Sequence, residues 1–71
     1  MSRQFQVLMR QARLNAGFSQ RQVAQALNVS GTSVYMSESG RAQPSLGHLV
    51  AIERLFGLPQ GMLILPCGYA D

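Results

Sequence analysis

Residues 19–45 read SQRQVAQALNVSGTSVYMSESGRAQPS, and this stretch decides the fold. Ser19 is followed three residues later by Gln22, which is the capping-box pattern of a helix N-terminus. Asn28 is one of the few non-glycine residues that tolerate a left-handed backbone, so a tight turn is expected at Asn28–Val29. Ser30 then supplies a second N-cap. The stretch predicts two short helices separated by about three residues.

Capping and helix-ending residues on either side of this stretch predict further helices. Ser45 is a third N-cap residue, and Gly17 and Gly57 are natural stops. Pro59 suits the first turn of a short fifth helix that runs through Ile64. No segment reads as a regular pair of strands. The expected architecture is an all-α bundle of five helices, at about 3–15, 19–27, 32–38, 46–56 and 59–65.

Length and composition limit the classes of protein to which the chain can belong. With 71 residues, 46% of them hydrophobic and 13% charged, it is expected to be one globular domain over 1–71. Cys67 is the only cysteine, which excludes an internal disulfide framework and a multi-cysteine zinc site, and it is expected to be inert. His48 is expected to be a plain surface histidine. We expect no metal site and no cofactor.

Charge and hydropathy indicate the kind of partner. The net charge is +3, all the basic residues are arginines, and the pI near 10.0 favours a polyanionic partner. The start of the chain does not read as a signal peptide, and its apolar runs are too short to span a bilayer. A soluble, cytoplasmic protein without a membrane contact is expected.

A longer series of motifs resembles one family. The residues are 17–20 (GFSQ), 23–24 (VA), 27–30 (LNVS), Val34, Glu38, Gly40, Pro44 and Ser45. In order and spacing they are similar to the lambda-repressor-like, Cro/repressor helix-turn-helix family, over roughly 5–65. The resemblance implies a five-helix DNA-binding domain, usually a dimeric transcription regulator of a prokaryote or phage. The implied partner is double-stranded DNA in the nucleoid, with no small-molecule ligand.

The resemblance also implies roles for individual residues. The second helix of the pair is the recognition helix, which enters the major groove. Arg13 and Glu38 match a largely buried ion pair that joins the first helix to the end of the recognition helix. The implied base-facing residues are Gly31, Thr32, Tyr35 and Met36, and the implied phosphate-contacting residues are Arg10, Gln20, Ser33, Arg41 and Gln43.

Two features depart from the family pattern. The recognition helix has no Arg, Lys, Asn or Gln among its exposed positions, so the bidentate contacts to guanine and adenine are absent from it. Specificity is then expected to depend on methyl contacts, water and DNA shape, or on Arg21 or Arg41 reaching the edge of the groove. Ser37 replaces a large apolar core residue, which leaves a small gap or a polar group in need of a partner.

Residues 58–71 are more apolar than a small domain should leave exposed. Leu63 is expected to face the core, and a dimerisation surface is expected from Leu58, Met62, Ile64 and Leu65. The alternative is a tail folded back on its own domain.

These expectations combine into a functional hypothesis. The chain is expected to be a homodimeric repressor that binds a near-palindromic operator, with half-sites about 34 Å apart. The alternative is an antitoxin or adaptor that uses the same fold to hold a protein partner. An enzyme is not expected, because the sequence offers no nucleophile–base set and no phosphate-binding glycine loop.

Overall fold

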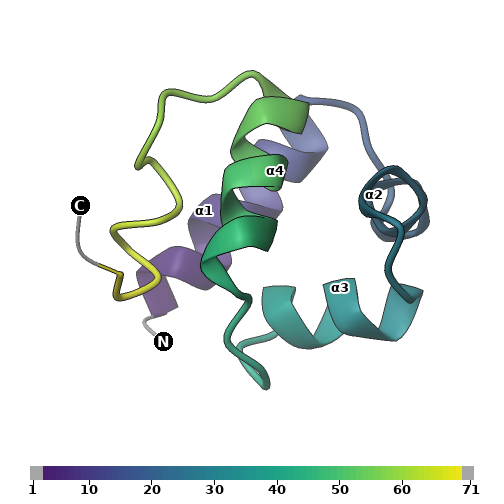
Figure 1. Ribbon diagram of the computed structural model, residues 1–71, viewed down its shortest axis with the longest axis horizontal. Helices are drawn as coiled ribbons and strands as arrows, with labels where there is room; N and C mark the ends of the chain where they lie inside the picture. Colours follow the sequence, from purple (N-terminus) through teal and green to yellow (C-terminus); the bar gives the residue numbers. More distant parts are fainter. Residues whose placement is uncertain (1–2, 70–71) are drawn as a thin grey trace.

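The computed structural model describes residues 3–69 and contains four helices in that range (Figure 1). They are α1 (Arg3–Asn15), α2 (Gln20–Leu27), α3 (Gly31–Glu38) and α4 (Leu46–Phe56). No strand occurs among the described residues. None of the described helices is long and apolar enough to cross a membrane. The predicted all-α class is confirmed.

Three serines begin three of the helices, as the sequence predicts. The hydroxyls of Ser19, Ser30 and Ser45 each accept a hydrogen bond from the backbone N–H three residues later. At Ser19 the reciprocal bond is also present, because its N–H donates to the Gln22 side chain at 2.8 Å. Asn28 ends α2 in the left-handed conformation, with φ 57° and ψ 46°. The turn between α2 and α3 is therefore encoded locally.

The prediction of a fifth helix is wrong. Residues 60–68 form a run of turns, whose hydrogen bonds mix two spacings: Leu65 N–H donates four residues back to Gly61, and Gly68 N–H donates three residues back to Leu65. Gly61 has φ 95°, which lies outside the right-handed helical region and interrupts the segment two residues after Pro59. The turns lie on the opposite side of α4 from α2 (Figure 1).

Glu53 of α4 holds this segment in place. Its side chain is buried, and its carboxylate accepts hydrogen bonds from the N–H groups of Gly61, Leu63 and Ile64 at 2.8–3.1 Å. These donors resemble the free N–H groups at the start of a helix, which need an acceptor when they are buried. The carboxylate of α4 thus takes the place of the N-cap that the segment lacks.

The C-terminal segment completes the main core. Leu63 is buried as expected, but so are Ile64 and Cys67. The core cluster contains Phe5, Met9, Leu49, Ile52, Leu63, Ile64 and Cys67. Ile64 was expected on a dimerisation surface, and that expectation is corrected because its side chain is only 6% exposed. Burial raises the pKa of the Cys67 thiol, which keeps it in its less reactive protonated form.

We expect Glu53→Gln to lower the free energy of unfolding by about 1–3 kcal/mol, measured by urea denaturation. The amide oxygen can replace Oε2, which accepts all three bonds, but the NH₂ group then stands at Oε1, toward which the Gly61 N–H points. Arg54→Gln, at the neighbouring exposed position of α4, serves as the control and should change stability little. Equal stabilities for the two variants would show that the carboxylate does not hold the segment.

Candidate nucleic-acid interface

A buried ion pair fixes α3 relative to the other helices. Arg13 Nε and one terminal nitrogen donate to the two carboxylate oxygens of Glu38, both at 2.8 Å. The other terminal nitrogen donates to the backbone oxygen of Phe18 at 2.9 Å. The hydrogen bond to Glu38 raises the pKa of the Arg13 guanidinium, although burial acts in the opposite direction. Arg13 therefore joins α1 to the end of α3 and to the start of α2.

A small apolar cluster holds α2 against α3. Val23 and Ala24 of α2 and Val34 of α3 are buried together. Val29 N–H donates to the Ala24 oxygen at 3.0 Å, which closes the turn between the two helices. With Val34, Ser37 and Glu38 turned inward, α3 presents its other side to solvent. Of the four predicted base-facing residues, Gly31, Thr32 and Tyr35 are exposed and Met36 is half-buried.

Three predicted site residues meet in a hollow on this side of the molecule. Arg10 of α1, Gln20 of α2 and Tyr35 of α3 line a space of about 110 Å³, together with Glu38 and Ser39. Gln20 lies at the first residue of α2, where backbone N–H groups are free to bind an anion. A positively charged side chain and a helix N-terminus thus face one opening. That combination suits a DNA phosphate.

Arg41 lies beside the same helix. Its backbone N–H donates to the Met36 oxygen at 2.9 Å, which ties the first loop residue to the end of α3. Its guanidinium carbon lies 5.9 Å from the centroid of the Tyr35 ring, within the range of a cation–π contact. Arg41 is therefore held over the exposed side of α3.

Gln43 and Ser33 are placed differently from the other predicted phosphate-contacting residues. The Gln43 side chain donates to the Cys67 oxygen at 3.1 Å, so part of its hydrogen-bonding capacity serves the C-terminal segment. A second bond, from the Tyr69 hydroxyl to the Pro44 oxygen at 2.9 Å, joins the same two segments. Ser33 is half-buried, and its backbone N–H donates to the Ser30 hydroxyl.

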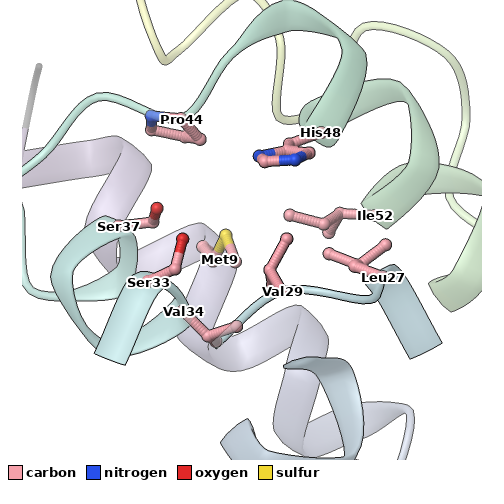
Figure 2. A pocket seen from close by; sticks show the side chains of 9 residues that line it. All are labelled: Met9, Leu27, Val29, Ser33, Val34, Ser37, Pro44, His48 and Ile52. Carbon is pink, nitrogen blue, oxygen red and sulfur yellow. The ribbon is translucent and has the colours of Figure 1, made fainter. Parts of the chain in front are cut away.

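Ser37 borders the small gap that the sequence anticipates. A cavity of about 10 Å³ lies between α3 and α4, which is close to the space that one water molecule needs. Figure 2 shows Ser33 and Ser37 of α3 on one side of it and His48 of α4 on the other. The packing of α3 is incomplete here, because the short side chain of Ser37 does not fill this space.

The domain itself does not require a residue as small as Gly31 at this position. A Cβ placed there would meet no atom within 4 Å, and its φ is not in the left-handed region. Gly31 is at the first turn of α3, which is the part that enters a groove first when such a helix binds DNA. A missing side chain at this point leaves room for a ligand outside the protein.

Two features of the site were missed by sequence reasoning. Ser39 was read only as a helix end, yet it lines the hollow beside Tyr35. Its spacing of four residues from Tyr35, which places both on one side of a helix, is the signal that could have indicated it. The bond between Tyr69 and Pro44 has no such signal, because it joins segments 25 residues apart.

Comparison with known proteins identifies the class that this geometry defines. A helix-turn-helix family model matches residues 9–59, which include all of α2, α3 and α4. The chain therefore belongs to the lambda-repressor-like, Cro/repressor type of helix-turn-helix proteins, a family of DNA-binding regulators. Comparisons with curated proteins and with solved structures gave no match.

We expect Gly31→Ala to weaken DNA binding by several-fold without lowering the melting temperature, because the added methyl group projects outward from the first turn of α3. Gly47→Ala is a matched control. Gly47 also lies in the first turn of a helix, and a Cβ there also meets nothing within 4 Å. Fluorescence anisotropy with a labelled duplex measures the affinity. Equal affinities for the two variants would remove Gly31 from the interface.

Proposed function

We propose that this protein is a transcriptional repressor that binds a near-palindromic operator as a homodimer, with α3 of each copy in one major groove. The observation that supports it most is the convergence of Arg10, Gln20 and Tyr35 in one hollow beside the exposed side of α3. Arg41, in the loop after α3, carries a second positive charge beside the same helix. Repression would follow from occupancy of a promoter inside the cell.

The assignment of roles follows the position of each side chain. Arg10 and Gln20 contact phosphates on one side of α3, and the exposed Gly31, Thr32 and Tyr35 face the bases. Met36 contributes an apolar contact at the edge. Phosphate contacts of this kind fix the register of the helix, and base contacts provide the sequence preference.

The homodimer proposal rests on the exposed part of the C-terminal segment. Met62 and Leu65 remain 41% and 48% exposed although their neighbours Leu63 and Ile64 are buried. Leu58 is half-buried beside Met62, and both line the same hollow. Large apolar side chains grouped in this way favour association. A two-fold contact through residues 58–69 would pair two copies with one patch.

A protein-binding adaptor is a second candidate function. An apolar hollow of about 320 Å³ lies between α1 and the residues that follow α4, with Leu8, Ala12, Phe56, Leu58 and Met62 in its lining. Hollows of this kind accept an apolar side chain of a partner. The adaptor and the homodimer would use some of the same residues, so substitutions there cannot distinguish the two functions. Selection of DNA sequences can distinguish a repressor from an adaptor.

Selection of bound duplexes from a random pool tests the main proposal. The expected result is a two-fold-symmetric consensus whose half-sites are about 34 Å apart, one turn of DNA. Such symmetry would follow from the pairing of two identical recognition helices. A pool without any enriched sequence would favour the adaptor.

We expect Leu65→Asp to shift the protein toward monomer in sedimentation velocity runs, because a charge in an apolar contact must lose its hydration. Val7→Asp is the control, since Val7 is similarly exposed but lies on α1. If both variants sediment as the wild type does, the C-terminal surface is not the dimer contact.

A further inference from the structure

The recognition helix lacks the side chains that usually distinguish one base pair from another. Its outward residues are a glycine, a threonine and a tyrosine, with a half-buried methionine. A threonine or an aromatic ring contacts a thymine methyl group, but neither makes the two parallel hydrogen bonds that select a guanine or an adenine. A residue outside α3 must supply such a contact if the operator contains a selected guanine.

Arg41 contacts α3 through both its backbone and its side chain. Two backbone bonds to the Met36 oxygen, from Arg41 at 2.9 Å and from Ala42 at 3.2 Å, hold the start of the loop against the end of the helix. From there the side chain runs back, so that its guanidinium carbon is 5.9 Å from the Tyr35 ring centroid. The ring attracts the cation and limits the positions it adopts.

The donors of Arg41 are available to a ligand. Within residues 3–69, the Arg41 guanidinium forms no ion pair and no hydrogen bond, whereas each nitrogen of the Arg13 guanidinium donates to an acceptor inside the domain. The two arginines therefore have opposite roles. The donors of Arg13 are all bonded within the domain. Arg41 retains a planar fork of N–H groups that matches two adjacent acceptors.

The space in front of Tyr35 is open. Gly31 precedes Tyr35 by four residues and so lies on the same side of α3, one turn nearer to the helix N-terminus. A Cβ at Gly31 would meet no protein atom. No side chain at position 31 therefore stands between the Tyr35 ring and a ligand that approaches from the N-terminal end of α3.

We infer that Arg41 is the specificity-determining residue, which reads a guanine through its O6 and N7 atoms, and that Tyr35 is the residue that positions it. This inference rests on the proposed function, because it needs α3 to lie in a major groove. It assigns Arg41 a base contact instead of the phosphate contact that the family resemblance implies. The two roles differ measurably, because removing a phosphate contact lowers the affinity for every DNA sequence alike.

The experiment compares the sequence preferences of the wild type and of Arg41→Lys by selection from a random duplex pool. Arg41→Lys keeps the positive charge but loses the planar fork. We expect one guanine position of each half-site to lose its preference by roughly tenfold or more, with little change in the salt dependence of binding. Arg54→Lys, an exposed arginine of α4 outside the interface, is the matched control and should leave the consensus unchanged.

A modified operator supplies a second measurement. Replacing the selected guanine by 7-deazaguanine removes the N7 acceptor, so wild-type affinity should fall while the affinity of Arg41→Lys should stay nearly the same. Tyr35→Phe keeps the ring and should keep the guanine preference, and Tyr35→Ala should reduce it. Melting temperatures verify that each variant is folded.

The outcomes separate the two proposals. If the wild type enriches no sequence, both the proposed function and this inference fail. If the wild type enriches an operator but Arg41→Lys shows the same base preference, only the inference fails, and a uniform loss of affinity makes Arg41 a phosphate contact.

Discussion

The buried ion pair between Arg13 and Glu38 is the constraint on which the rest of the structure depends. Removal of one partner from such a pair leaves an unpaired buried charge, at a cost of about 3–5 kcal/mol. A domain of this size has a total stability of only about 5–15 kcal/mol, so this loss would be large. Because Arg13 also bonds the Phe18 oxygen, one side chain sets the relation of α1, α2 and α3. The exposed side of α3 is directed outward because Glu38 is fixed inward.

A second buried carboxylate, that of Glu53, fixes the C-terminal segment. Glu53 binds three backbone N–H groups of the C-terminal segment, and that segment then closes the core over Phe5 and Leu49. The same segment reaches the loop after α3 through the bonds of Gln43 and Tyr69. The loop that carries Arg41 is thus connected to the surface proposed for dimerisation. Glu38 thus fixes the end of α3, and Glu53 holds the segment that contacts the loop after it.

Small residues lie on both sides of α3 in the candidate interface. Ser37 leaves a gap behind α3, and Gly31 leaves space in front of it. The polar and charged groups that face the hollow come from three different helices, so no single segment of sequence contains the site. This distribution explains why a nearly neutral recognition helix is compatible with membership of a DNA-binding family.

The sequence by itself determined the boundaries of α1 to α4 to within one residue, because N-cap serines, a left-handed asparagine and apolar spacing act over three or four residues. It also predicted the family, since the motif from Gly17 to Ser45 keeps its order and spacing. It did not reveal that Glu53 replaces an N-cap, that Gly61 prevents a fifth helix, or that Ile64 and Cys67 are core residues. It did not reveal that Arg41 folds back over Tyr35. Only the tertiary structure decided these points, because each depends on contacts between different segments of the chain or on a backbone angle that glycine leaves open.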